Sequence, residues 1–182
     1  MRLYHTGYQE IRKPDIYRGR RNADFGQGFY LTADRAFSER WAKEKKGSEV
    51  YVNQYELDTD GLIVKCFERD MEWFRYLADN RGGRPDRLAG CDVIAGPIAN
   101  DTIYDVMGII TSGFLTPEES LKLLRIGPAY RQVVLKTEKA AARLAFLSAG
   151  ILPPEKIAAS RILLREEEED YRRKLAEALE TE

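Results

Sequence analysis

The sequence contains very little histidine and cysteine, and this scarcity excludes several classes of enzyme. His5 is the only histidine among 182 residues, and the two cysteines, Cys66 and Cys91, lie far apart and outside any Cys-x-x-Cys pair. A structural or catalytic zinc centre needs three or four such ligands close together. We therefore expect no metal site, and we expect both cysteines to be free thiols, as is usual in a reducing cytosol.

Long apolar segments and an excess of one charge are also absent from the sequence. The first residues lack the apolar core of a signal peptide, and no apolar run approaches the roughly 20 residues that a membrane-spanning helix needs. Lysine and arginine number 29 against 30 aspartate and glutamate, which gives a formal net charge of -1. No overall field therefore attracts nucleic acid or a membrane surface, and we expect a cytoplasmic protein that binds no membrane.

Several common catalytic motifs are missing as well. The sequence has no His-Glu-x-x-His, no lysine in a Gly-rich phosphate loop and no Gly-x-Ser-x-Gly turn. These absences argue against a zinc protease, a P-loop nucleotidase and an α/β-hydrolase. Gly26-x-Gly28 lacks the third glycine and the following helix of a dinucleotide-binding βαβ unit, so the sequence predicts no such unit there.

The pattern of apolar residues, caps and turns predicts one α+β domain over residues 1–182, without a repeating βαβ alternation. The turn Asp58–Gly61 predicts a hairpin between the strands that flank it. After Pro153 and Pro154 we expect residues 153–182 to form a charged helical extension. We expect strands at 2–5, 28–32, 50–57, 62–67, 92–97 and 132–136, and helices at 34–46, 69–80, 101–112, 116–127 and 137–150.

Two segments near the N-terminus indicate a ligand site. His5 lies where the first strand meets Gly7, and residues 24–30 read Asp-Phe-Gly-Gln-Gly-Phe-Tyr. Between them runs a long irregular segment rich in arginine, and long segments of this kind in a compact domain usually carry function. One imidazole beside a glycine turn, followed by a Gly-x-Gly-Phe-Tyr strand, indicates a nucleotide pocket.

The segments that carry His5, Tyr30 and Gln132 resemble the histidine–tyrosine class of ADP-ribosyltransferases, the branch of diphtheria toxin and poly-ADP-ribose polymerase. More closely, the chain resembles the bacterial domain-of-unknown-function family 3990, which is grouped with those enzymes. The similarity is densest at residues 13–15, 19–30 and 132–140.

The resemblance implies an ADP-ribosyltransferase-like split β-sandwich, in which two small, roughly orthogonal sheets enclose an NAD⁺ cleft. It implies that NAD⁺ is the substrate, that ADP-ribose is transferred to a protein or nucleic acid, and that nicotinamide is released. His5 would bind the adenosine-side ribose, Tyr30 would stack on nicotinamide and Gln132 would hold the nicotinamide ribose. Family resemblance further implies a bacterial toxin with a small antitoxin protein as its partner, or a role in phage defence.

The same resemblance assigns further residues to NAD⁺ binding. Nicotinamide in NAD⁺ is a flat cation, which aromatic faces attract by stacking and cation–π contact. Ser38 and Trp41 would complete the nicotinamide slot, with a backbone contact from Thr6 or Gly7. Arginines of the irregular segment could hold the pyrophosphate. The other expected ligand-binding residues are Arg20, Asn22, Phe25, Gly28 and Phe29.

Gln132 stands where the superfamily usually has glutamate, and this difference leaves two alternatives open. A glutamine can hydrogen-bond ribose hydroxyls but cannot act as a general base. Glu138 lies beyond the strand and is poorly placed to replace it. The first alternative is an NAD⁺ glycohydrolase, which uses water as acceptor, and the second is a catalytically weak module that binds NAD⁺ or ADP-ribose.

Three other residues or segments allow two interpretations each. Trp41 lies four residues after Phe37, so it belongs either to the pocket or to an ordinary core stripe. Residues 18–21 form either a phosphate clamp or a solvated loop. For Asp24 we expect a cap on the turn before Gly26 rather than a ligand contact.

Overall fold

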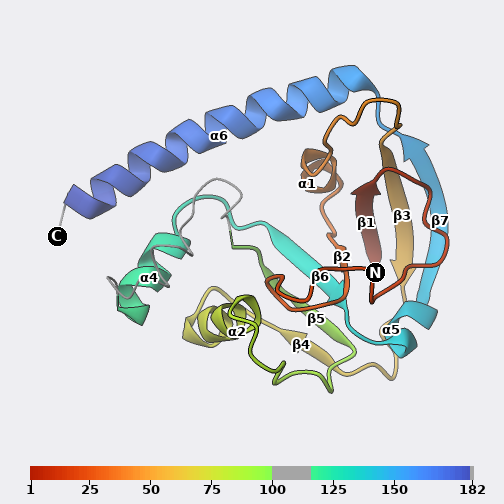
Figure 1. Cartoon of the computed structure of the whole chain (residues 1–182), viewed down its shortest axis with the longest axis horizontal. Helices are drawn as coiled ribbons and strands as arrows, with labels where there is room; N and C mark the ends of the chain where they lie inside the picture. Colours follow the sequence, from red (N-terminus) through yellow and green to blue (C-terminus); the bar gives the residue numbers. More distant parts are fainter. Residues whose placement is uncertain (100–115, 181–182) are drawn as a thin grey trace.

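A computed structural model of the chain describes residues 1–99 and 116–180 and has two open β-sheets flanked by helices (Figure 1). The first sheet contains β1 (Arg2–Gly7), β3 (Tyr51–Leu57) and β7 (Leu144–Ile151), in the order β1-β3-β7. Both pairings are antiparallel, and His5 lies opposite Asn53. The first sheet therefore carries the single imidazole on its edge strand.

The second sheet contains β2 (Phe29–Leu31), β6 (Arg131–Leu135), β5 (Val93–Pro97) and β4 (Val64–Cys66), in the order β2-β6-β5-β4. The β2–β6 and β6–β5 pairings are antiparallel, whereas β5 and β4 run parallel. Buried apolar residues dominate β5 and β6, the two central strands. The fold is thus mixed α+β, as expected.

Five helices are described for this part of the chain, and their caps follow from the sequence. Asp34, Asp70 and Thr137 each accept a hydrogen bond from a backbone N–H in the first turn of the following helix, and Thr116 forms a capping box with Glu119. Such caps satisfy N–H groups that have no partner within the helix. The helices are α1 (Arg35–Arg40), α2 (Met71–Arg81), α4 (Pro117–Leu124), α5 (Glu138–Ala142) and α6 (Pro154–Glu180).

The C-terminal segment forms one long helix, α6. It begins at the second proline of the Pro-Pro pair, passes α1 and reaches the region of α4 (Figure 1). Tyr171 is buried, and its hydroxyl donates to the carbonyl of Leu123 in α4 at 3.5 Å. Within the described residues no helix combines the length and apolar character needed to cross a bilayer.

Two predictions based on local pattern are wrong. Residues 50–57 and 62–67 do not form a hairpin, because β3 and β4 belong to different sheets. The alanine-rich segment 137–150 is helical only in α5, and the rest forms β7, where Phe146 packs edge-on against Tyr55 of β3 at 5.9 Å. Pairing with a distant strand overrides the helical propensity of alanine here.

Other boundaries shift by smaller amounts, and one connection differs in type. The helix expected at 34–46 ends at Arg40, with Trp41 as its C-cap. Helix α2 connects the parallel strands β4 and β5, so one β-α-β unit exists although the sequence indicated no such alternation. The element expected at 101–112 lies outside the described residues.

The two sheets meet at their edges through β1 and β2. Tyr4 N donates to the carbonyl of Thr32 at 2.8 Å, and Thr32 N donates to the carbonyl of Tyr4 at 3.0 Å. This reciprocal bridge places His5 beside Tyr30. The junction between the sheets is therefore where the two residues singled out by the sequence come together.

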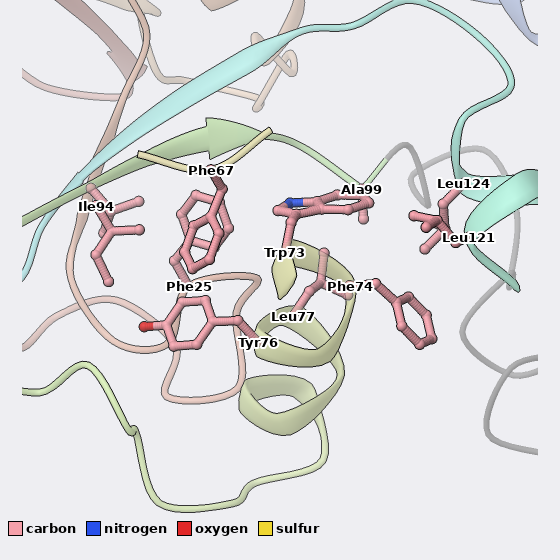
Figure 2. Packing of buried hydrophobic residues seen from close by; sticks show 11 residues of the cluster. Phe25, Phe67, Trp73, Phe74, Tyr76, Leu77, Ile94, Ala99, Leu121 and Leu124 are labelled. Carbon is pink, nitrogen blue, oxygen red and sulfur yellow. The ribbon is translucent and has the colours of Figure 1, made fainter. Parts of the chain in front are cut away.

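Buried aromatic residues hold α2 against the second sheet (Figure 2). Phe25, Phe67, Trp73 and Tyr76 are almost fully buried, and Phe67 and Tyr76 stack with ring centroids 5.2 Å apart. The indole Nε1 of Trp73 donates to the carbonyl of Pro97 at 3.0 Å, which satisfies its polar atom. This cluster gives the loop that contains Phe25 a rigid support.

Asp92, at the start of β5, should make the stability of the fold pH-dependent. Its carboxylate accepts hydrogen bonds from Thr137 Oγ1 at 2.6 Å and Ile63 N at 2.9 Å and pairs with Lys139 at 3.1 Å. These donors hold the pKa of Asp92 at about 2. We expect Asp92→Asn to lower the free energy of unfolding by about 2 kcal/mol at neutral pH.

The pH dependence follows from the direction of this shift. A lowered pKa stabilises the fold fully above the unfolded-state pKa, which is about 4, and that stabilisation is lost as the pH falls toward 2. Urea denaturation of both proteins between pH 2 and 7 should show their difference shrinking below about pH 4. A difference that stays constant over this range would contradict the assigned network.

Candidate functional site

His5 is fixed in one tautomer by the backbone of β2. Its Nδ1 lies 2.8 Å from the carbonyl oxygen of Tyr30, and a carbonyl can only accept, so Nδ1 carries the proton. The ring also packs on Phe29, with centroids 4.6 Å apart. Burial lowers the pKa of His5 below its ordinary value, so the ring is neutral at pH 7 and its Nε2 is a hydrogen-bond acceptor.

His5 and Tyr30 lie between two cavities and contribute to the walls of both. We call these the first cavity, of about 620 Å³, and the second cavity, of about 500 Å³. The first is also lined by Trp41, Gln132 and charged residues, and the second by glycines and cationic residues. Each volume lies in the range of small-molecule sites, and the shared wall makes them two compartments of one candidate site.

The hydroxyl of Tyr30 is bound to the loop that precedes β2. It donates to the carbonyl of Gly26 at 2.7 Å and accepts from Phe25 N at 3.0 Å. Burial raises the pKa of Tyr30 well above its usual value, so the phenol stays protonated. The ring, rather than the hydroxyl, is the part of Tyr30 left to contact a ligand.

Gly26 allows this loop to close. Its φ of +71° is in the left-handed region, and a Cβ there would lie 2.8 Å from Asn80 Oδ1 and 2.9 Å from Lys136 Nζ. Lys136 donates to the carbonyl of Phe25 and pairs with Asp86 at 3.0 Å. The loop is thus held from both sides, which fixes the position of the Tyr30 ring.

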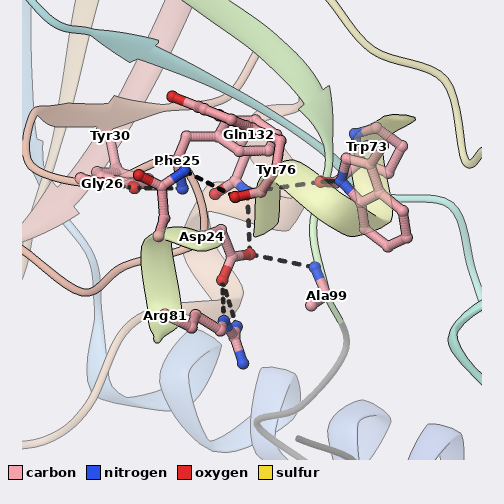
Figure 3. A network of polar contacts seen from close by, with 11 residues as sticks. Asp24, Phe25, Gly26, Tyr30, Trp73, Tyr76, Arg81, Ala99 and Gln132 are labelled. Atoms are coloured by element: carbon pink, nitrogen blue, oxygen red, sulfur yellow. Dashed lines mark hydrogen bonds and ion pairs between the residues drawn. The ribbon is translucent and has the colours of Figure 1, made fainter. Parts of the chain in front are cut away.

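Asp24 is the centre of a polar network at the first cavity (Figure 3). Its Oδ1 accepts two hydrogen bonds from the guanidinium of Arg81, one of them from Nε at 2.9 Å. Its Oδ2 accepts from Ala99 N at 3.1 Å and from Gln132 Nε2 at 3.0 Å. The carboxylate therefore joins the loop before β2, the end of α2, the segment after β5 and the start of β6.

Gln132 is almost completely buried, yet it contributes to the wall of the first cavity. Besides the bond to Asp24, its Nε2 lies 3.5 Å from the carbonyl oxygen of Pro97. Both amide protons thus point toward acceptors of the protein. The carbonyl oxygen Oε1 is the atom with which Gln132 can bind a ligand.

The second cavity lies under the segment that follows β1. Asn53 of β3 holds this segment, since its Oδ1 accepts from Ile11 N at 2.8 Å and its Nδ2 donates to the carbonyl of Gln9 at 3.1 Å. Tyr55 donates to the carbonyl of Ile11 at 2.7 Å. The cationic lining residues are Lys13, Arg18 and Lys45, and Asp15 is the one carboxylate among the residues that line this cavity.

The other expected ligand-binding residues fall into two groups. Thr6 and Ser38 are buried and hydrogen-bond each other through their hydroxyls at 2.7 Å, and Phe25 belongs to the core. None of these three is among the described residues that line either cavity. The cavity walls do include Arg20, Asn22 and Trp41 in the first and Gly7, Gly28 and Phe29 in the second.

Trp41 satisfies both interpretations that its spacing left open. Its ring packs edge-on against Phe37, with centroids 5.1 Å apart, and Phe37 stacks on Tyr130 at 4.2 Å. Trp41 is nevertheless only half-buried and contributes to the first cavity. An aromatic core stripe thus supports the residue that reaches the ligand space.

Sequence reasoning missed the structural role of two residues near the first cavity. Asp24 was expected only to cap a turn, but it pairs with Arg81 and orients Gln132. Arg81 ends α2, and no motif marks it. One feature of the sequence could have indicated this role: Asp24 begins the Gly-rich segment and is the only acidic residue in residues 16–33.

Comparison with known proteins gives a family without an assigned activity. The model of the family described as "Protein of unknown function (DUF3990)" matches residues 1–146, which include both cavities but not α6. No curated protein and no solved structure matches the chain. Among the described residues no cluster of three or more histidine, cysteine or acidic side chains could hold a metal ion.

Proposed function

The chain belongs to this family, and from the geometry of the two cavities we propose that it is an ADP-ribosyltransferase that uses NAD⁺ as substrate. The observation that carries the proposal is that His5 and Tyr30 line both cavities. A ligand with two ends and a narrow middle can lie along these residues and occupy both compartments. A dinucleotide has that form.

The chemistry of each cavity favours one end of NAD⁺. The first contains the aromatic rings of Tyr30 and Trp41 and the amide oxygen of Gln132, which suit nicotinamide and its ribose. The second contains Lys13 and Arg18, which suit the phosphates on the adenosine side. We assign the nicotinamide half to the first cavity and the adenosine half to the second.

In the proposed reaction the bond between nicotinamide and ribose C1′ breaks, and nicotinamide leaves with the electron pair. A nucleophile of the acceptor forms the new bond to C1′ and loses its proton to solvent. The protein contributes by binding the adenosine-side ribose through His5 Nε2, by fixing the nicotinamide ribose through Gln132 Oε1, and by holding the leaving ring against Tyr30. Such positioning accelerates a step with oxocarbenium character.

The two open sheets that meet at β1 and β2 support a place for this fold among the split β-sandwiches of the ADP-ribosyltransferases. Resemblance alone extends the proposal to a bacterial toxin whose partner is a small antitoxin protein. The acceptor is a macromolecule, protein or nucleic acid.

One observation favours a second candidate function. Gln132 contributes no carboxylate, so it cannot activate an acceptor hydroxyl as a base. A site of this kind could release ADP-ribose to water, as a glycohydrolase, or bind NAD⁺ with little turnover. The glycohydrolase would yield free ADP-ribose, whereas the binding module would leave NAD⁺ intact.

Incubation of the protein with adenylate-labelled NAD⁺ and cell extract separates the three. We expect label on a macromolecule, and digestion of the product with protease or nuclease identifies its class. Label recovered as free ADP-ribose would indicate the glycohydrolase instead. If NAD⁺ stays intact but calorimetry shows that it binds, the protein is the binding module. If NAD⁺ is neither turned over nor bound, the assignment of NAD⁺ is refuted.

A further inference from the structure

We propose that Asp24 is a positioning residue that makes Gln132 present its carbonyl oxygen to the first cavity, so that this point of the site accepts a hydrogen bond from a ligand hydroxyl. The inference rests on the proposed function, because the ligand hydroxyl is taken to be that of the nicotinamide ribose. It concerns which end of an amide meets the substrate.

The amide of Gln132 is held in one orientation. Its two ends have nearly the same shape but opposite hydrogen-bonding character, so neighbouring groups determine which way it points. On one side of the amide are the Asp24 Oδ2 at 3.0 Å and the Pro97 carbonyl oxygen at 3.5 Å. Both are acceptors. An amide oxygen turned toward them would face a carboxylate in a buried place, so Nε2 must point there.

Asp24 itself cannot turn away from Gln132. Arg81 binds its Oδ1, and the backbone N–H of Ala99 donates to its Oδ2 at 3.1 Å. The side chains of Asp24 and Arg81 are only 12% and 17% exposed, so water offers them little alternative. Arg81 and Ala99 therefore fix the direction of Asp24 Oδ2 independently of Gln132 (Figure 3).

With Nε2 committed to the protein, Gln132 offers Oε1 to the first cavity and selects a hydrogen-bond donor there. A sugar hydroxyl meets this requirement, whereas a phosphate or carbonyl oxygen does not. The pair formed by Asp24 and Gln132 thus gives the site the acceptor character of a carboxylate while the residue nearest the ligand stays neutral.

A double-mutant cycle tests this role through nicotinamide release at varied NAD⁺ concentration. In Asp24→Asn, the introduced amide would accept from Arg81 through its oxygen and turn its NH₂ toward Gln132, so the Gln132 amide flips; the hydrogen bond from Ala99 N is lost in this variant and in the double variant alike. In Gln132→Glu, two carboxylates would lie about as close as the present 3.0 Å pair, and they repel. We expect each single variant to lose at least about tenfold in kcat/KM.

The double variant should recover activity, and this recovery separates positioning from a merely structural role. In Asp24→Asn with Gln132→Glu the hydrogen bond is reversed, because the introduced asparagine would donate and a carboxylate oxygen would face the cavity. We expect kcat/KM about tenfold above either single variant. The matched control is Asp92→Asn, which changes a buried acid at the other end of β5. We expect Asp92→Asn to lower the melting temperature, and we expect its combination with Gln132→Glu to be no more active than Gln132→Glu alone.

Each outcome resolves the inference. Wild-type kcat/KM in Asp24→Asn, or a double variant no more active than the weaker single variant, would overturn it. If Asp24→Asn does not fold, Gln132→Glu alone tests the proposal, because this variant keeps the Asp24–Arg81 pair. A Gln132→Glu variant with activity equal to or above wild type would overturn the proposal. A wild-type protein that releases no nicotinamide would instead refute the proposed function, and this inference with it.

Discussion

Replacement of Tyr30 by alanine should lower kcat/KM for NAD⁺ by roughly 100-fold to 1,000-fold. The change removes the ring that lines both cavities. It also removes the hydroxyl that holds Gly26 and Phe25, so the loop that carries Asp24 loses an anchor. Nicotinamide release under steady-state conditions measures the effect.

The matched control is Tyr30→Phe, which keeps the ring and removes only the hydroxyl. Because the phenol oxygen bonds the loop and not the cavity, we expect this variant to lose about 1–2 kcal/mol of stability. Its kcat/KM should stay within about tenfold of wild type. A phenylalanine variant as inactive as the alanine variant would show that the hydroxyl, rather than the ring, serves the reaction.

Replacement of His5 should have the second largest effect, about 100-fold in kcat/KM. Asparagine is the informative substitute, because its side-chain NH₂ can take the place of Nδ1–H and still donate to the carbonyl of Tyr30. It has no counterpart of Nε2. We expect His5→Asn to fold with nearly the stability of wild type and to lose activity.

The control for His5 is glutamine, whose longer side chain can bring an amide group to the position of Nε2. We expect His5→Gln to retain more activity than His5→Asn. We also expect the wild-type protein to lose the proposed activity on acidification only below pH 6.5, since burial lowers the pKa of His5 and protonation replaces the Nε2 lone pair with a donor. An asparagine variant as active as wild type would exclude Nε2 from the site.

The sequence predicts those parts of the fold that depend on neighbouring residues. Capping at Asp34 and Thr116 involves contacts three residues apart, and the structure confirms both. Strands β3 and β7 pair residues that are far apart in the chain, and local pattern gave the second of them as a helix. Non-local pairing is decided by the partner strand, which a single sequence does not identify.

The candidate site shows the same division. His5 and Tyr30 were expected to share a cleft, and in the structure both residues line both cavities. The orientation of Gln132 was not predictable, because it depends on Asp24, Arg81 and the Pro97 carbonyl, which come from three distant segments. The resemblance assigned Ser38 to the nicotinamide slot, yet its hydroxyl is hydrogen-bonded to that of Thr6.

We propose that one dinucleotide occupies both cavities and lies along His5 and Tyr30, which line both. A crystal structure with an NAD⁺ analogue whose nicotinamide–ribose bond cannot be cleaved tests it most directly. We predict nicotinamide against Tyr30 and Trp41 in the first cavity, and the adenosine half beside Lys13 and Arg18 in the second. An analogue bound away from His5 and Tyr30, or confined to one cavity, would contradict the claim.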